Sequence, residues 1–257
     1  MTKLFDLHEG DTPLLISVPH DGRLVPGETE ARMSAAGRSL GDTDWHVTYL
    51  YDFARDLGAS IINARYSRYV IDLNRPSSDE ALYDGQLSTG LCPTRTFAGE
   101  PIYVDDAPID VAARVKQYWQ PYHDEVSATL KLLRNRHGHA LLWDAHSIAS
   151  SVPTLFEGRL PVLNIGTWAG RSCSAARGEA VAAAAAASPY EFVMDGRFKG
   201  GYITRHYGRP AEGVEAIQLE IAQRAYMNES SREYDDAKAS QLRDTLRAML
   251  AAFTMPG

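Results

Sequence analysis

Short apolar runs rich in β-branched residues alternate along the chain with longer segments of helical periodicity. The apolar runs predict strands at 14–18, 60–64, 69–73, 140–144, 161–166 and 215–221. The periodic segments predict helices at 42–58, which has an acidic start and a terminal glycine, and at 108–137, 172–188 and 233–254. Strands that alternate with helices of this length indicate an α/β fold with helices on both faces of a central sheet.

No linker rich in Gly, Ser or Pro divides the sequence, so we predict a single domain over residues 1–257. The segment 74–106 lacks periodicity and is rich in Pro, Ser, Asp and Gly. A loop of that length in a compact domain is often functional. In open α/β sheets, reactive groups gather at the carboxyl ends of the strands, so the residues that follow the predicted strands are the first candidates for a site.

Composition and charge narrow the classes of function. Of 257 residues, 44% are hydrophobic and 23% are charged, as in ordinary globular proteins. The net charge of −7 argues against nonspecific nucleic-acid binding, which needs a broad basic surface, but it permits a small anionic substrate. No run approaches the ~18 apolar residues of a membrane span, and the N-terminus lacks the apolar core of a secretion signal. We therefore expect a cytoplasmic protein that binds neither membrane nor nucleic acid; a monomer and a homodimer both fit the sequence.

Several common catalytic motifs are absent from the sequence. It contains no S-x-x-K, no P-loop and no G-x-G-x-x-G. The two cysteines, Cys92 and Cys173, lie far apart and outside any C-x-x-C, so in a reducing compartment they are expected to be free thiols. Either could act as a nucleophile with a histidine, but an isolated cysteine is far more often structural. Because H-E-x-x-H is also missing, any metal site has to draw its ligands from separate segments.

Two histidines lie at equivalent positions near the ends of predicted strands. The strand at 14–18 leads directly into "PHDG", which contains His20, and the strand at 140–144 leads into "DAHS", which contains His146. A single histidine at such a place is more often a packed or capping residue. Two of them at the carboxyl ends of central strands favour a metal site, for which zinc would need a third protein ligand and an open position.

Carboxylates close to these histidines supply candidates for the remaining ligand. "GDTDWH" offers Asp42 and Asp44 at the start of a predicted helix, where aspartate is also favoured as a cap. Capping uses one aspartate and leaves the second, Asp44, able to reach a metal. Asp144 lies on the same strand face as His146, where it either orients that histidine or caps a neighbouring loop.

A candidate base and a set of cations complete the pattern. Glu220 interrupts the apolar strand "AIQLEI", where a carboxylate is costly unless it is functional or forms a salt bridge. Asn74 and Arg75 follow the predicted strand at 69–73, and further cations lie in the glycine-rich "GRFKGGYITRHYGRP". Those relevant to binding a carboxylate are Arg197, Lys199 and Arg205. The expected ligand is a small dianion or the carboxylate of an amino acid.

The assembled segments resemble those of N-formylglutamate amidohydrolases, enzymes of histidine degradation. The matching segments run from residue 17 to 227 and are "SVPHDG", "DTDWH", "ARYSRYVIDLNRP", "LLWDAHSI", "LFEGRLPVLNIGT", "GRFKGGYITRHYGRP" and "AIQLEIAQRAYM". The resemblance implies a three-layer α/β/α fold with a mixed, mostly parallel sheet, similar to the zinc exopeptidases. In those enzymes an Asp-Leu-Asn-Arg segment binds the substrate carboxylate, and Asn74 and Arg75 match it here. Their Asp-x-His-Ser segment carries a metal ligand that matches His146, and their late glutamate matches Glu220. His20 matches their first metal histidine.

One departure from the zinc carboxypeptidases concerns the acidic ligand. They take it three residues after the first histidine, where this chain has Arg23, so we expect Asp44 to replace it, with Asp42 as the alternative. The resemblance implies hydrolysis of N-formyl-L-glutamate to formate and L-glutamate, with zinc as the metal and cobalt or iron as alternatives. Which cation binds which carboxylate stays open. Two other functions fit the residues: an amidase or carboxypeptidase acting on another N-acyl amino acid, and a non-catalytic binder of acidic amino acids.

Overall fold

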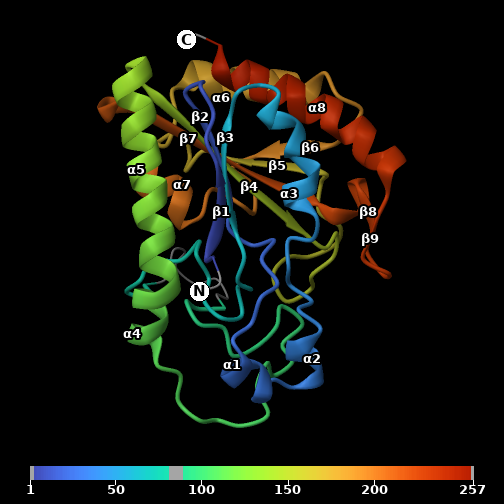
Figure 1. Cartoon of the computed structure of the whole chain (residues 1–257). Helices are drawn as coiled ribbons and strands as arrows, with labels where there is room; N and C mark the ends of the chain where they lie inside the picture. The colour runs from blue at the N-terminus through green and yellow to red at the C-terminus, as the bar shows by residue number, and fades with distance from the viewer. Residues whose placement is uncertain (1–2, 81–88, 256–257) are drawn as a thin grey trace.

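The computed structural model describes residues 3–80 and 89–255, and its centre is a seven-stranded sheet (Figure 1). The strands are β1 Phe5–His8, β2 Leu14–Val18, β3 Ser60–Ala64, β4 Ala140–Ile148, β5 Leu163–Gly166, β6 Phe192–Met194 and β7 Val214–Ala222. They lie in the order β1-β3-β2-β4-β7-β5-β6. The pairs β2–β3, β2–β4, β4–β7 and β5–β6 are parallel, whereas β1–β3 and β5–β7 are antiparallel. The sheet is therefore mixed and mostly parallel, as the resemblance implies.

Helices connect and cover the strands. The α-helices are α1 Gly27–Ala31, α2 Ala35–Arg38, α3 Val47–Leu50, α4 Val111–Arg114, α5 Gln120–His137, α6 Ala175–Ala186, α7 Tyr202–Tyr207 and α8 Asp236–Thr254. Shorter helical pieces are η1 Asp52–Arg55, η2 Val115–Trp119, η3 Pro210–Glu212 and η4 Gln223–Ala225, and a small hairpin pairs β8 Met227–Asn228 with β9 Glu233–Tyr234. Within the described ranges, no helix combines the length and the apolar character needed to cross a bilayer.

The alternation of side chains along the strands builds two cores, one on each face of the sheet. In β2, Leu14 and Ile16 belong to the core that contains residues of α6 and α8, whereas Leu15 belongs to the core of α5. Figure 1 shows the same division, with α5 on one side of the sheet and α6 and α8 on the other. This three-layer α/β/α arrangement confirms the predicted fold class.

Most of the predicted elements are present in the structure. The strands at 14–18 and 60–64 have the predicted bounds, and the predicted helix at 108–137 corresponds to α4, η2 and α5, with η2 forming a π-helical turn. Gly138, at φ 80°, ends α5 in the left-handed conformation that favours glycine. The strand predicted at 140–144 is longer, because β4 continues to pair with β7 as far as Ile148. His146 therefore lies inside a strand and not after its end.

Two predicted elements are wrong. The segment 42–58 is not one helix but the short α3 and η1, preceded by a turn in which His46 has φ 64°. The run 69–73 is not a strand, because Val70 N donates to Ser67 O in a turn and Asp72 N donates to Leu91 O of a loop. The side chains of Val70, Ile71 and Leu73 are buried by packing on the α5 core and not by sheet pairing. The pattern also missed β1 and β6, the two edge strands of the sheet.

Candidate active site

His20, Asp44 and His146 converge at the carboxyl end of the central strands. Each offers one ligand atom, and the three atoms lie within 4.8 Å of one another. Asp44 Oδ2 lies 3.7 Å from His20 Nδ1 and 3.0 Å from His146 Nδ1. His20 follows β2, Asp44 lies in the turn before α3, and His146 lies in β4. All three residues are buried, with exposed fractions of 1–2%.

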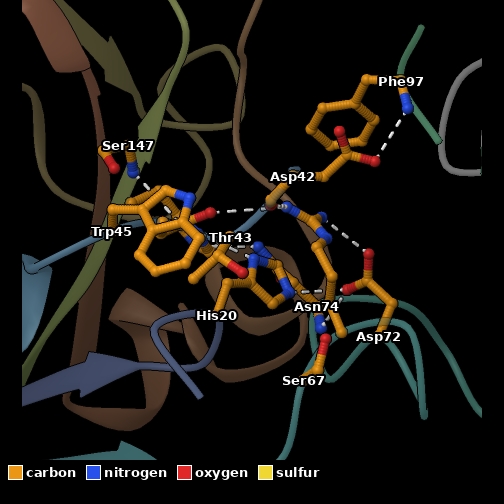
Figure 2. Close-up of polar contacts among 12 residues, drawn as sticks. His20, Asp42, Thr43, Trp45, Ser67, Asp72, Asn74, Phe97 and Ser147 are labelled. Carbon is orange, nitrogen blue, oxygen red and sulfur yellow. Dashed lines mark hydrogen bonds and ion pairs between the residues drawn. The ribbon is translucent and has the colours of Figure 1, made fainter. Parts of the chain in front are cut away.

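The turn that carries Asp44 is held by an aspartate outside the predicted helix. The Asp21 carboxylate accepts hydrogen bonds from His46 N at 3.1 Å and from Thr48 N at 2.9 Å, and it thereby caps the start of α3. Asp42 instead accepts from Phe97 N at 2.8 Å, as Figure 2 shows. The interpretation of Asp42 and Asp44 as helix caps is therefore wrong, and Asp44 is the aspartate that joins the two histidines.

The second nitrogen of His20 is held by a carboxylate that the sequence did not single out. His20 Nε2 lies 2.8 Å from Asp72 Oδ1, which also accepts from Asn74 N at 2.8 Å (Figure 2). Although burial opposes ionisation, the neighbouring His20, Arg68 and Arg75 hold the pKa of Asp72 well below its usual range. An ionised Asp72 fixes the ring of His20 with Nδ1 directed at Asp44.

The second nitrogen of His146 lies between an acceptor and a donor. His146 Nε2 is 3.1 Å from Asp144 Oδ1 and 2.9 Å from Asn74 Nδ2, so either tautomer has a partner. Thr204 of α7 donates to Asp144 Oδ2 at 3.2 Å. Burial lowers the pKa of His146, but Asp144 and Asp44 outweigh that effect and raise it well above its ordinary value. These carboxylates thus stabilise positive charge at His146, as a cation site requires.

A buried arginine links two of these carboxylates. Arg68 Nη2 lies 2.8 Å from Asp72 Oδ2, and Arg68 Nη1 lies 3.4 Å from Asp44 Oδ1. The Phe97 ring lies against this guanidinium, with its centroid 4.8 Å from Cζ. Because Arg68 occupies Oδ1 of Asp44, Oδ2 is the oxygen that faces both histidines.

The segment after β7 ties the two ligand-bearing segments together. Gln223 Nε2 donates to Thr43 O at 3.0 Å, and the Tyr226 hydroxyl donates to Trp45 O at 2.7 Å, so the carbonyl groups of both chain neighbours of Asp44 are held. The Tyr226 hydroxyl also lies 2.6 Å from Ser147 Oγ, next to His146. The ligand geometry therefore depends on side chains that lie outside the ligand set.

Glu220 lies on β7 directly opposite His146 of β4 in the parallel register. It is 8% exposed, and burial raises the pKa of its carboxyl to about 8. Throughout residues 3–80 and 89–255, its carboxylate makes no hydrogen bond or ion pair, which argues against the salt-bridge interpretation. A desolvated carboxyl beside a cluster of metal-type ligands is suited to proton transfer near neutral pH.

The predicted substrate-binding cations lie further out. Arg75 is half-buried and donates to Asn74 O, and its Nε is buried without a hydrogen-bond partner among the described residues. Arg205 Nε donates to Gly200 O at 2.8 Å and Arg197 Nε donates to Leu155 O at 2.7 Å, whereas Lys199 is exposed. These contacts tie the side chains of Arg75 and Arg197, which lie on loops, and of Arg205, which lies in α7, to main-chain carbonyl oxygens.

Asn74 occupies a different position from these cations. Its Oδ1 accepts from Ile203 N at 2.8 Å, and its Nδ2 contacts His146 Nε2, so both ends of the amide face inwards. Gly201 makes this approach possible, since a Cβ atom there would lie 2.3 Å from Asn74 Nδ2. Binding of substrate by Asn74 stays a prediction; its contacts resemble those of a residue that orients His146.

The functional neighbours missed at the sequence level share one signal. Asp72 interrupts the apolar run "YVIDL", as Glu220 interrupts its strand, and Arg68 is the charged residue directly before that run. Gln223 and Tyr226 carry no comparable signal, because their role depends on where the chain turns after β7.

Comparison with known proteins places this geometry in a family. The profile of the family described as N-formylglutamate amidohydrolase matches residues 12–227. The chain is 48% identical to the N-formylglutamate deformylase of Pseudomonas putida over 261 residues, which covers 98% of this chain and 97% of that protein. It is 47% identical to the N-formylglutamate deformylase of Pseudomonas aeruginosa over 262 residues, with the same coverage of both chains.

Solved structures show the same fold. The crystal structure of N-formylglutamate amidohydrolase from Ralstonia eutropha JMP134 superposes with a TM-score of 0.83 at 25% identity and covers 96% of each chain. A protein from Agrobacterium tumefaciens shares the fold alone, with a TM-score of 0.72 at 20% identity, covering 99% of this chain and 97% of its own. From the profile match and the identity to both Pseudomonas proteins, we conclude that the chain belongs to the N-formylglutamate amidohydrolase family.

Proposed function

We propose that this protein hydrolyses N-formyl-L-glutamate to formate and L-glutamate with the help of a divalent metal ion. The proposal is carried by one observation: three metal-type ligand atoms converge beside a desolvated Glu220, in a chain whose relatives are named N-formylglutamate deformylases. A binder without catalysis would have no use for a carboxyl kept unpaired in an apolar strand.

The donor set fits zinc. Two imidazole nitrogens and one carboxylate oxygen are ligands of catalytic zinc sites, where ligand bonds of ~2.0–2.2 Å leave a fourth position for water. Such bonds at tetrahedral angles separate neighbouring ligand atoms by roughly 3.3–3.5 Å. The distances of 3.7 and 3.0 Å from Asp44 Oδ2 to the two Nδ1 atoms bracket this range. Cobalt and iron accept the same donors, and the ligand set alone does not select among them.

The chain's own residues divide the remaining work. A bound metal ion supplies Lewis-acid polarisation of the formyl carbonyl and lowers the pKa of water. Glu220 takes the proton from the attacking water as oxygen adds to the formyl carbon. When the carbon–nitrogen bond breaks, Glu220 returns a proton to the leaving nitrogen, so the carboxylate is restored and L-glutamate leaves as the amine.

The charged residues around the ligands orient the two histidines and balance the local charge. Asp72 and Asp144 keep Nδ1 of each histidine directed at the metal position, while Arg68 offsets part of the local negative charge. We assign the substrate carboxylates to Arg75 and Arg205 first, with Arg197 and Lys199 as further candidates. Arginine can hold a carboxylate through two parallel hydrogen bonds, which would fix the formamide at one position.

The test is release of L-glutamate from N-formyl-L-glutamate by purified protein, before and after chelation and again after zinc is restored. We expect turnover that is lost with the metal and regained with it. Turnover that is indifferent to chelation would remove the metal from the proposal. If zinc-loaded protein releases no glutamate, the assignment of the substrate fails. Repeating the restoration with cobalt and iron identifies the metal that gives the highest kcat.

Two further assignments rest on the resemblance. A place as the last step of histidine degradation follows from the substrate that the resemblance implies, and we propose the cytoplasm as the location. Deleting the encoding gene would be expected to abolish growth on histidine with accumulation of N-formylglutamate, and fractionation would be expected to recover the activity in the cytoplasm.

A further inference from the structure

A cavity of about 190 Å³ lies beside the ligand cluster. Its apolar walls come from the loop at 97–98 and from the segment that follows His146. The residues that line it are Gly41, Asp42, Thr43, Phe97, Ala98, Ser147, Ile148, Ala149, Ser151, Val152, Pro153 and Gln223. Apolar cavities of ~150 Å³ bind a six-carbon ring in other proteins, so this one has room for a short hydrocarbon chain.

The cavity adjoins the proposed reaction centre. Two of its lining residues, Thr43 and Ser147, are the chain neighbours of the ligands Asp44 and His146. Ile148 lies two residues after His146 on β4, so their side chains share one face of the sheet. On another wall, the Phe97 ring packs against the Arg68 guanidinium that contacts Asp44.

The chemistry of the lining decides which end of the substrate can enter. Among the described residues that form its walls there is no Lys, Arg or His, and the ionisable one is Asp42, an acid. A substrate carboxylate would lose its hydration there without gaining a cation, which is unfavourable. Of the two ends of the scissile amide, the glutamate end therefore belongs with the proposed arginines outside the cavity, and the acyl end faces the cavity.

We propose that this cavity is an acyl pocket and that the protein also hydrolyses N-acyl-L-glutamates with short unbranched acyl chains. The inference rests on the proposed function, since it uses the same metal, the same base and the same glutamate end. The reaction balances in the same way: water adds to the acyl carbon, the carbon–nitrogen bond breaks, and a short carboxylic acid leaves instead of formate. A formyl group carries only hydrogen on its carbon, so it leaves the cavity unfilled.

The experiment compares kcat/KM for N-formyl-, N-acetyl-, N-propionyl- and N-butyryl-L-glutamate with zinc-loaded protein. Burial of each added methylene group should raise kcat/KM by about fourfold from the acetyl to the butyryl substrate. This slope does not depend on the higher intrinsic reactivity of the formyl group. A kcat/KM that falls with each carbon, or turnover confined to the formyl substrate, would overturn the acyl pocket and leave the proposed function standing.

Substitutions that narrow the cavity test where the chain lies. In Ala149→Leu the ratio of kcat/KM for the butyryl over the formyl substrate should fall by about tenfold or more, because a filled pocket rejects added methylenes. Ala149→Ser, similar in volume, is the matched control and should keep the ratio. Ala98 is exposed at the rim, so Ala98→Leu serves where the first variant does not fold. An unchanged ratio in both leucine variants would contradict the proposal.

Two other outcomes separate the hypotheses. If N-formyl-L-norleucine is hydrolysed as well as N-formyl-L-glutamate, and Ala149→Leu lowers that turnover selectively, the cavity holds the amino-acid side chain and the acyl pocket is wrong. If the longer acyl substrates are hydrolysed but N-formyl-L-glutamate is not, the acyl pocket stands and the proposed physiological substrate fails. If none of the substrates is hydrolysed, both fail.

Discussion

The side of the site that carries the candidate metal ligands and the side to which we assign the substrate are built in different ways. On the ligand side, His20, Asp44 and His146 are buried, and each histidine has a carboxylate at its second nitrogen. On the substrate side, Arg75 and Arg205 are half-buried and donate to main-chain carbonyl oxygens. The first region is fixed by buried pairs of charged side chains, whereas the second lies closer to solvent.

This difference separates the expected effects of substitution. Pre-organised buried charges determine whether the metal is held and how the proton moves, so changes there should alter metal affinity and kcat. If Arg75 and Arg205, which we call the rim, bind the substrate equally in its ground and transition states as proposed, changes there should mainly raise KM. Each of the following predictions tests that division.

The largest effect is expected from Glu220→Gln. The amide keeps the shape of the side chain but cannot take a proton, so kcat should fall by roughly 10²–10⁴-fold. Zinc content, measured by atomic absorption, should stay at one per chain. Glu215→Gln is the matched control on the same strand, because Glu215 pairs with Arg177 near the start of β7, and its kcat should be unchanged. Loss of zinc from the Glu220 variant would instead make this residue part of the ligand support.

The carboxylates behind the histidines should give the next largest effect. Asp72→Asn and Asp144→Asn should weaken zinc binding by about 10–100-fold, measured by competition with a chelator. Asp72→Asn should be the more severe, since Asp72 also holds Arg68 and the backbone of Asn74. Asp105→Asn removes an exposed aspartate that pairs with Arg32, and it should not change zinc affinity. Equal affinity in all three variants would mean that the ligands hold their geometry without this support.

A smaller effect is expected at the rim. Arg75→Lys keeps the charge but loses the forked donor geometry, so KM for N-formyl-L-glutamate should rise by about tenfold with little change in kcat. The exposed Arg38→Lys is the control. Arg75 also helps to lower the pKa of Asp72. A loss of zinc affinity in Arg75→Lys would therefore show that Arg75 supports the metal ligands and does not act only on the substrate.

The contrast between the two sides also marks what the sequence could predict. The strands β2, β3 and β4 and the helices α5, α6 and α8 are long or strongly patterned, and the pattern that predicts them is the one that builds the two cores. The edge strands β1 and β6 are short and only partly buried, so they leave little pattern. The broken helix at 42–58 was not predictable locally, because its cap comes from Asp21 on another segment.

The same limit applies to the site. His20 and His146 could be predicted as partners because reactive groups gather at the carboxyl ends of neighbouring strands. In the structure the ligand atoms of these two histidines do lie close together. Asp72 escaped because its segment was predicted as a strand, where its carboxylate would have had no reason to meet His20. Long-range contacts formed by turns leave no periodic trace in the sequence, and they supply most of the support behind the ligands.

The smallest predicted effect concerns a histidine beneath the segment that joins the two sides. Buried His123 donates from Nε2 to Leu73 O at 2.9 Å, in the segment that runs from Asp72 of the ligand side to Arg75. Burial lowers the pKa of His123 to about 3, whereas in the unfolded chain it is near 6.5. The unfolded state therefore binds the extra proton first, so the stabilising contribution is complete above pH 6.5 and is lost as the pH falls towards 3.

His123→Gln keeps a donor for Leu73 O but cannot titrate, so comparison with it isolates this histidine. From pH 7.5 to pH 5 the free energy of unfolding of the wild type should fall by about 2 kcal/mol more than that of the variant, measured by urea denaturation. Parallel pH profiles would show that His123 is hydrated or charged in the folded state. Because Leu73 lies between the two sides, loss of the stabilising contribution of His123 at low pH should raise KM and weaken zinc binding together. A change in only one of these two quantities would mean that the ligand side and the rim are supported independently.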